Sequence, residues 1–144
     1  MEYKMFCYDY PRPAVTVDIV IFAGEDPELL LIRRKHLPFE GYWALPGGFV
    51  EMDESLEEAA RRELEEETDV SDVTLTEIGA FGDPARDPRG RVITIAYVAV
   101  LEKRLLKVEA GSDAAEVAWF STTNLPALAF DHAEIIQKAL ETTK

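Results

Sequence analysis

The chain has 144 residues, the usual size of one domain, and 47% of them are hydrophobic, which is enough for one packed core. Its 28 Asp and Glu residues outnumber 15 Lys and Arg residues, and the formal net charge of -13 repels phosphate backbones, so we expect no nucleic-acid polymer as a partner. Cys7 is the only cysteine, which excludes an intramolecular disulfide. No segment approaches the ~20 apolar residues of a membrane span, and no signal peptide is recognisable. We predict one cytoplasmic domain over residues 1–144 with no membrane contact.

Strand and helix signals alternate along the chain without a regular βαβ repeat. Alternating or β-branched apolar residues predict strands over 2–8, 15–22, 29–33, 74–81, 91–101 and 116–121, the first of them within an N-terminal strand or arm over residues 1–13. Two helices, 55–69 and 131–142, are predicted to open with capping boxes, one from Ser55 and Glu58 and one from Asp131 and Glu134. Residues 38–45 and 82–90 are expected to be long loops. These elements predict an α/β fold with a mixed sheet and helices packed on it.

Some residues are expected to serve the fold alone. Strand 91–101 carries apolar residues at both alternating positions, which predicts burial on both faces. Trp43 and Trp119 are expected in the core, and His132 is expected to find a hydrogen-bond partner at the start of the last helix.

The helix over 55–69 carries an acidic stripe on its apolar side. At 100° per residue, Glu66 and Glu67 fall about 60° and 40° from Glu63, on the same side as the apolar residues of the helix. These carboxylates repel one another near a helix C-terminus, where the dipole disfavours anions. A divalent cation bound by oxygen ligands removes the conflict, and Mg²⁺ favours such ligands. A solvated acidic face is instead the expected role of Glu57, Glu58 and Glu65.

Two glycines, Gly47 and Gly48, precede this helix and would allow a close approach of the backbone to a ligand. From there the sequence resembles the Nudix box, G-x5-E-x7-R-E-U-x-E-E-x-G-U with U aliphatic. The matching residues are Gly48, Glu54, Arg62, Glu63, Leu64, Glu66, Glu67 and Val70. Asp69 stands where the pattern has glycine, and we expect it to close the helix in a left-handed conformation, at some cost in stability. The Nudix resemblance extends over residues 14–140 and implies the α/β/α sandwich of that family.

The resemblance also implies roles for individual residues. Glu63, Glu66, Glu67 and the Gly47 carbonyl are the implied metal ligands, for Mg²⁺ or Mn²⁺. Arg62 and Glu54 are the implied residues that orient the catalytic glutamates, of which we name Glu66 and Glu67. The implied reaction is metal-dependent hydrolysis of a pyrophosphate bond, which requires no covalent nucleophile. In several family members the general base is a glutamate outside the box, and of Glu109, Asp113 and Glu116 we favour Glu116.

Three further segments indicate the substrate. The loop over 82–91 holds Arg86, Arg89 and Arg91, which would either clamp phosphates or form surface ion pairs. Residues 10–18, 86–90 and 128–132, with Pro84, resemble the ADP-ribose pyrophosphatase branch of the family. That resemblance implies cleavage of ADP-ribose to AMP and ribose 5-phosphate by a homodimer, with residues 1–13 as a dimer-forming arm. We name Arg33, Arg86, Arg89 and Phe49 as substrate-binding residues.

Two alternatives to this function stay open. Nucleoside triphosphates and nucleotide sugars are rival substrates for an enzyme. A non-catalytic module that senses ADP-ribose or a related nucleotide is the rival function, because regulators that share these flanking runs attach the domain to a DNA-binding winged helix. The chain ends at Lys144, so we expect no winged helix, and the intact metal box favours an enzyme.

Overall fold

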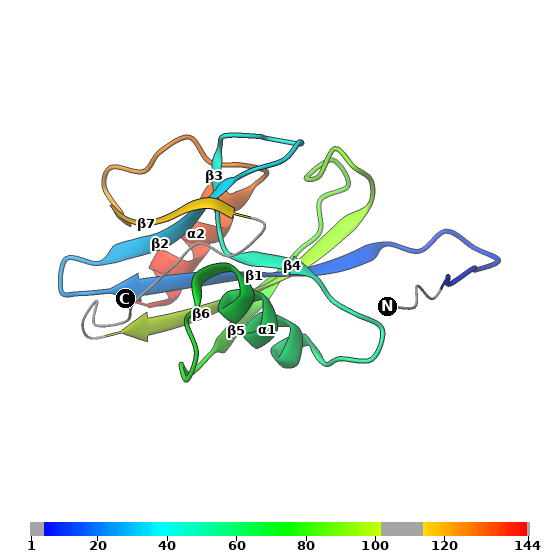
Figure 1. Cartoon of the computed structure of the whole chain (residues 1–144), viewed down its shortest axis with the longest axis horizontal. Coiled ribbons are helices and arrows are strands. Elements are labelled where there is room, and N and C mark those ends of the chain that lie inside the picture. The colour runs from blue at the N-terminus through cyan, green and yellow to red at the C-terminus, as the bar shows by residue number, and fades with distance from the viewer. Residues whose placement is uncertain (1–4, 102–113, 144) are drawn as a thin grey trace.

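The structure is a computed structural model that describes residues 5–101 and 114–143. Its elements in chain order are β1 (Ala14–Ala23), β2 (Glu28–Arg34), β3 (Trp43–Ala44), β4 (Gly47–Phe49), α1 (Leu56–Thr68), β5 (Thr76–Phe81), β6 (Val92–Leu101), β7 (Ala114–Ser121) and α2 (His132–Thr142) (Figure 1). Among the described residues, neither helix has the length and hydropathy needed to cross a bilayer.

All the strands named above belong to one sheet. Its main order is β3-β2-β1-β6-β5, with β4 paired to β1 and β7 paired to β2. β1 and β6 run parallel over ten residue pairs, from Ala14↔Val92 to Ala23↔Leu101, whereas the other pairings are antiparallel. The predicted mixed sheet is therefore confirmed.

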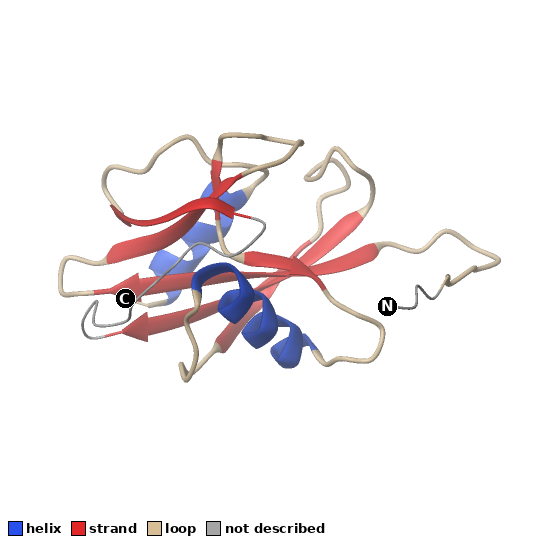
Figure 2. Ribbon diagram, viewed as in Figure 1, coloured by secondary structure: helices blue, strands red, loops and turns tan. Residues whose placement is uncertain are grey.

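The two helices cover opposite faces of the sheet, with α1 in front of it and α2 behind it in the view of Figures 1 and 2. Alternate residues of β1 supply the two cores: Val17 and Ile19 pack in the cluster that includes α1, and Val20 and Phe22 in the cluster that includes α2. β6 divides in the same way, with Tyr97 in the first cluster and Ala96 and Val98 in the second. Burial of each large aliphatic side chain contributes about 1.5–3 kcal/mol, so the two cores hold the three layers together. The predicted α/β/α sandwich is confirmed, as is the burial of β6 on both faces.

The tryptophans pack as expected. Trp43 and Trp119 lie against the second and first clusters, respectively, as partly buried side chains. Trp43 also contacts the Phe120 ring edge-on, at 4.7 Å between centroids. Both rings therefore serve the fold.

Two strand predictions need correction. The strand expected over 2–8 is wrong for residues 5–8, which are exposed and irregular, while residues 2–4 lie outside the described part of the chain. Their aromatic content resembles that of a strand, but no strand of the sheet pairs with them. Conversely, the sequence predicted no strand where β3 and β4 lie: β3 falls in the expected 38–45 loop, and β4 contains the two glycines. Such short strands show no periodicity, because their pairing with β2 and β1 is what fixes them.

The two helices begin differently. Ser55 accepts a hydrogen bond from the Glu58 amide, and Glu58 accepts one from the Ser55 amide, both at 3.1 Å, so the predicted capping box of α1 is confirmed. The capping box predicted for α2 is wrong, because Asp131 makes no side-chain cap. Its carboxylate instead accepts two hydrogen bonds from Arg86, at 2.8 and 2.6 Å. A charge-assisted bidentate pair outweighs a single cap bond to an amide.

The end of α1 has the left-handed cap that the sequence predicts. Asp69 follows the helix with φ 62° and ψ 19°, and its amide donates to the Glu65 carbonyl at 2.9 Å. A residue with a Cβ is strained there, whereas glycine is not.

Asp69→Gly is expected to stabilise the protein by up to ~1 kcal/mol, because it removes the left-handed strain from an exposed position. Thermal unfolding followed by circular dichroism measures the effect, and the melting temperature should rise by a few degrees. Asp69→Ala is the matched control and should lower it, because alanine tolerates the left-handed conformation less well than aspartate. An unchanged or lower melting temperature in Asp69→Gly would contradict the cap argument.

Candidate active site

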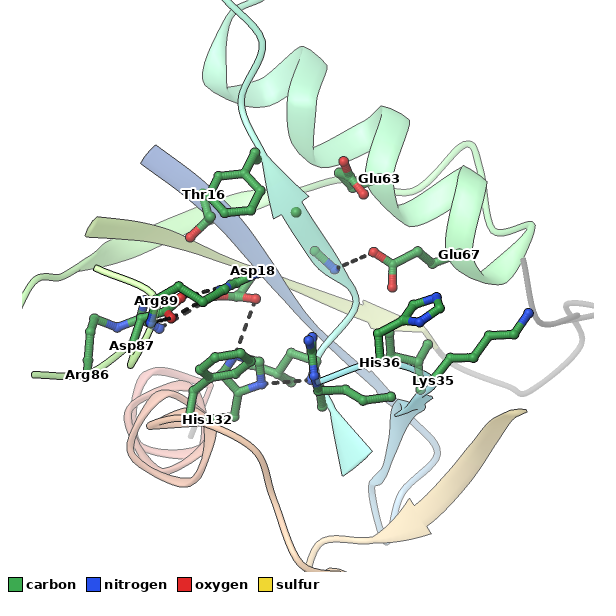
Figure 3. A pocket seen from close by; sticks show the side chains of 18 of the residues that line it. Thr16, Asp18, Lys35, His36, Glu63, Glu67, Arg86, Asp87, Arg89 and His132 are labelled. Atoms are coloured by element: carbon green, nitrogen blue, oxygen red, sulfur yellow. Dashed lines mark hydrogen bonds and ion pairs between the residues drawn. The ribbon is translucent and has the colours of Figure 1, made fainter. Parts of the chain in front are cut away.

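A cavity of about 390 Å³ lies beside β4 and is the place where the predicted site residues meet. Its lining includes an acidic group (Glu51, Glu63, Glu67), a cationic and aromatic group (Arg34, Lys35, Arg89, Phe49, Phe130) and a largely buried polar group (Thr16, Asp18, Arg86, Asp87, His132). The volume falls within the range of about 300–1,000 Å³ that is usual for small-molecule sites. Figure 3 shows Glu63 and Glu67 reaching toward β4 from α1, with Asp18 and His132 on the other side of that strand.

The two glycines bring β4 close to the acidic helix. The Gly47 amide donates a hydrogen bond to Oε1 of Glu67 at 3.2 Å. A Cβ at Gly48 would overlap the carboxylate of Glu63, and a Cβ at Gly47 would overlap the Val17 carbonyl and the Asp18 side chain. Because neither residue has a side chain, Gly48 lets the strand lie against the carboxylate of Glu63 and Gly47 lets it pair closely with β1.

Glu63 and Glu67 are neighbouring acids that are poorly exposed to solvent. Only 7% of Glu67 is exposed, and its carboxyl lies beside that of Glu63. Burial, followed by the negative charge of Glu63, raises the pKa of Glu67 to about 9. Burial also raises the pKa of Glu63, against the opposing influence of Arg62. Two buried carboxyls in contact cannot both be charged without a compensating cation.

Arg62 holds the acidic residues around it. Its guanidinium makes a bidentate pair with Glu54, at 2.9 and 2.6 Å, and donates to Glu63 at 2.8 Å and to Glu66 at 3.2 Å. It also donates to the Phe49 carbonyl at 3.0 Å, which ties α1 to the end of β4. This geometry agrees with the predicted orienting role of Arg62 and Glu54, although that role itself stays a prediction.

The prediction that three glutamates of α1 turn inward is wrong for Glu66. Its side chain is 58% exposed and turns toward Arg62, whereas Glu63 is only 13% exposed. The position lies at the margin of the stripe, where the arginine can reach the carboxylate from solvent. The role of Glu66 as a ligand or catalytic group therefore stays a prediction. Glu57, Glu58 and Glu65 are exposed, as expected for a solvated face.

The donor set suits a hard divalent cation. Glu63 and Glu67 offer carboxylate oxygens beside the backbone of Gly47, which are the oxygen ligands that Mg²⁺ prefers. Within residues 5–101 and 114–143, no three Asp, Glu, His or Cys side chains gather closely enough to enclose an ion by themselves. A magnesium site of this kind is completed by water and substrate phosphate oxygens, so a pair of carboxylates fits it.

Buried charges lie beside this acidic pair. Asp18, on β1, accepts a hydrogen bond from Thr94 at 2.6 Å and lies 3.4 Å from Nε2 of His132 and 4.0 Å from Arg86. Burial alone would raise the pKa of Asp18, but His132, Thr94 and Arg86 together hold it below the usual value. Nδ1 of His132 accepts from the Leu45 amide at 3.0 Å, so the expected partner of that histidine is confirmed.

The four residues predicted to bind substrate occupy different places. Phe49 and Arg89 line the cavity, with the Arg89 guanidinium 5.1 Å from the Phe49 ring and 5.3 Å from the Phe130 ring. Arg86 also lines it, but its side chain is only 3% exposed and is bound by Asp131. Arg33 is not among the lining residues, because it points to Glu116 and the Gly41 carbonyl.

The predicted general base, Glu116, lies on β7 outside the lining of the cavity. Its carboxylate accepts a hydrogen bond from Arg33 at 3.0 Å, and both side chains are exposed. Glu109 and Asp113, the other two base candidates, lie outside the described residues. The base therefore stays a prediction.

Sequence reasoning missed several lining residues, notably Asp18, Arg34, Asp87 and Phe130. Asp18 carried a usable signal, since it is a charged residue in the middle of an apolar strand, and buried charges are rare unless they are paired. Arg34 and Phe130 gave no such signal in the sequence, because only the fold brings them together. The Arg34 guanidinium lies 5.0 Å from the centroid of the Phe130 ring.

The relatives of similar sequence include an enzyme and a regulator. An ADP-ribose pyrophosphatase from Methanocaldococcus jannaschii is 48% identical over 128 residues, which is 89% of this chain and 73% of the relative. An ADPR responsive transcriptional repressor, NtrR, from Acinetobacter baylyi is 38% identical over 91% of this chain and 54% of its own length.

Solved structures share the fold, and two of them bear on function. The NUDIX domain of Shewanella oneidensis NrtR, crystallised with ADP ribose, matches with a TM-score of 0.87 and 33% identity over 95% of this chain and 94% of that one. A bifunctional NMN adenylyltransferase/ADP ribose pyrophosphatase from Francisella tularensis, complexed with AMP and a Mn ion, matches with a TM-score of 0.83 and 30% identity. That match covers 95% of this chain and 44% of the bifunctional protein.

The family profile described as NUDIX domain matches residues 12–139, nearly the whole described chain. With the sandwich fold, the glycine pair against the acidic helix and the relatives above, this match confirms the resemblance found in the box. The chain belongs to the Nudix hydrolase family.

Proposed function

We propose that the chain hydrolyses ADP-ribose to AMP and ribose 5-phosphate, with Mg²⁺ as the cofactor and Mn²⁺ as a substitute. The observation that carries the proposal is one cavity that is lined both by the neighbouring acids Glu63 and Glu67 and by the side chains of Arg89 and Phe49. The 48% identity to an ADP-ribose pyrophosphatase and the ADP ribose bound to the Shewanella domain support the choice of substrate.

The acidic side of the cavity holds the proposed cation. Glu63, Glu67 and the Gly47 carbonyl are the proposed ligands, with Glu66 joining them if it leaves Arg62. When bound there, Mg²⁺ would neutralise pyrophosphate oxygens and favour ionisation of the attacking water. Arg62 keeps Glu63 in place through a hydrogen bond that is largely shielded from solvent.

The cationic side of the cavity is proposed to bind the nucleotide. Arg89 is oriented by Asp87, which accepts from its Nε at 3.1 Å and from Nη2 at 2.8 Å. Its side chain remains 40% exposed and can donate to phosphate or ribose oxygens, while the half-exposed Phe49 ring can contact a base. Arg86 is proposed to act through the loop that carries Arg89, because its own donors are engaged by Asp131.

Glu116 is the proposed general base. It pairs with Arg33 across β2 and β7, in register, and this ion pair must open for the carboxylate to meet a substrate. An exposed ion pair contributes only about 0–1 kcal/mol, so its opening costs little. Arg33 would then be available to substrate phosphate, the role proposed for it from the sequence.

The second candidate function is a non-catalytic module that senses ADP-ribose. The 38% identity to an ADPR responsive transcriptional repressor favours it. Nucleoside triphosphates and nucleotide sugars are the rival substrates if the chain is an enzyme.

A substrate panel separates these possibilities. ADP-ribose, nucleoside triphosphates and nucleotide sugars would each be incubated with the full chain in Mg²⁺, in Mn²⁺ and in EDTA, and the products resolved by chromatography. We expect AMP and ribose 5-phosphate from ADP-ribose with either metal, and none in EDTA. Faster turnover of another compound would overturn the substrate, and tight binding of ADP-ribose without any turnover would favour the sensor.

Glu67→Gln is expected to lower kcat by several orders of magnitude, because it removes a metal-binding charge while the amide oxygen can still accept from Gly47. Steady-state kinetics on ADP-ribose measures the loss, and circular dichroism checks the fold. Glu65→Gln is the matched control, since Glu65 is an exposed glutamate of the same helix, and it should retain wild-type turnover. Near-wild-type activity in Glu67→Gln would show that the assignment is wrong.

We also propose that the chain forms a homodimer through its N-terminal arm, residues 1–13. Met5, Phe6 and Tyr10 are 88%, 51% and 79% exposed, which is high for three large hydrophobic side chains so near one another in the sequence. A second copy of the chain would bury them, as symmetric dimers commonly do. Sedimentation equilibrium of the full chain should give twice the monomer mass of 16.2 kDa, whereas a monomer at micromolar concentration would contradict the proposal.

A further inference from the structure

The 45–47 turn, which joins β3 to β4 and ends on the first residue of β4, is bound from three directions. The Leu45 amide donates to Nδ1 of His132 at 3.0 Å, and the Pro46 carbonyl accepts from the Ile19 amide at 2.8 Å. The Gly47 amide donates to Glu67 at 3.2 Å. Proline has no amide hydrogen, so both backbone donors of this turn are given to side chains from the two helices.

His132 makes its contact with Leu45 in one tautomer. Because Nδ1 accepts a hydrogen bond, the ring proton lies on Nε2, which faces Oδ1 of Asp18 at 3.4 Å. The histidine is only 4% exposed, and Figure 3 shows its ring between Asp18 and the turn. A flipped ring would present the wrong nitrogen to both neighbours.

Asp18 is held in turn from its other side. Its second oxygen accepts from Thr94, which is fully buried on β6, at 2.6 Å, and Arg86 lies 4.0 Å away. The backbone of Asp18 pairs with Gly47 in the sheet. The carboxylate therefore has little freedom to move, and it fixes the orientation of the histidine ring.

These contacts form a short path from the buried pair to the metal-binding acids. The path runs from Asp18 through His132 to Leu45, and two residues later Gly47 binds Glu67. We infer that His132 and Asp18 are positioning residues for the metal site: the ring holds the 45–47 turn where the Gly47 backbone meets Glu67. The inference rests on the proposed function, because it takes Glu63 and Glu67 to be the metal ligands.

Two isosteric variants separate the two contacts of the ring. His132→Asn retains an acceptor near the position of Nδ1, so it can still bind the Leu45 amide. His132→Gln retains a polar group near the position of Nε2 and loses the acceptor for Leu45. Mn²⁺ binding to the full chain without nucleotide, measured by electron paramagnetic resonance titration below the melting temperature, reports on the site independently of catalysis.

We expect His132→Gln to weaken Mn²⁺ binding about tenfold, which is the usual effect of losing a group that orients a metal ligand, and His132→Asn to retain most of the affinity. In the activity assay, the Mg²⁺ concentration for half-maximal rate should rise for His132→Gln while the KM for ADP-ribose at saturating Mg²⁺ stays unchanged. Ile136→Val, at a buried residue of the same helix, is the control for lost stability and should bind Mn²⁺ like the wild type.

The outcomes distinguish this inference from the proposed function. No Mn²⁺ binding by the wild type would overturn the inference, and if ADP-ribose is also not hydrolysed with Mg²⁺ or Mn²⁺, the proposed function is overturned as well. Mn²⁺ binding that is equal in the wild type and His132→Gln, or equally weakened in Ile136→Val, would overturn the inference alone. If His132→Gln does not fold, Thr94→Val replaces it in the test, because this variant removes a hydrogen bond to Asp18 without changing the turn. We expect Thr94→Val to bind Mn²⁺ more weakly than the wild type. Unchanged binding would overturn the inference.

Discussion

The close approach of the β4 backbone to the carboxylates of α1 is the contact on which the rest of the site depends. Gly47 donates its amide to Glu67, and Gly48 has no Cβ that would collide with Glu63. The same approach forces two acids together in a poorly solvated place, where the pKa of Glu67 rises to about 9 through burial and the neighbouring charge of Glu63. Such an arrangement is unfavourable without a cation and favourable with one, because opposite charges at short range in a low-dielectric site interact strongly.

The sandwich fold supplies the parts of this contact from separate elements. β1 pairs with β4 on one side and with β6 on the other, so β4 is attached to a central strand of the sheet. α1 brings the acids, and the 82–91 loop brings Arg86 and Arg89. Arg86 binds the loop to α2 through Asp131, and α2 contributes His132 to the turn before β4. A small shift of either helix would therefore move residues that line the cavity.

Much of this architecture could be predicted from the sequence, because the periodicity of long elements and the spacing of the box report on local structure. The left-handed cap at Asp69 and the capping box of Ser55 follow from one or two residues each. Long-range pairing could not be predicted: β3 and β4 exist through their neighbours, and Asp131 gives up its cap to Arg86, 45 residues away. The exposed position of Glu66 has a local origin instead: Arg62 lies four residues earlier on the same helix and holds the carboxylate at the solvent side, a pairing that the i,i+4 spacing allowed but angular position alone did not reveal.

The central claim is that a divalent cation lies between Glu63 and Glu67. A crystal soaked in Mn²⁺ and measured at the manganese absorption edge tests it most directly, because anomalous scattering locates the ion without reference to activity. The account predicts an anomalous peak bound by both carboxylates, at the ~2.0–2.2 Å typical of small divalent cations with oxygen ligands. No peak there, with the two side chains still side by side, would contradict it.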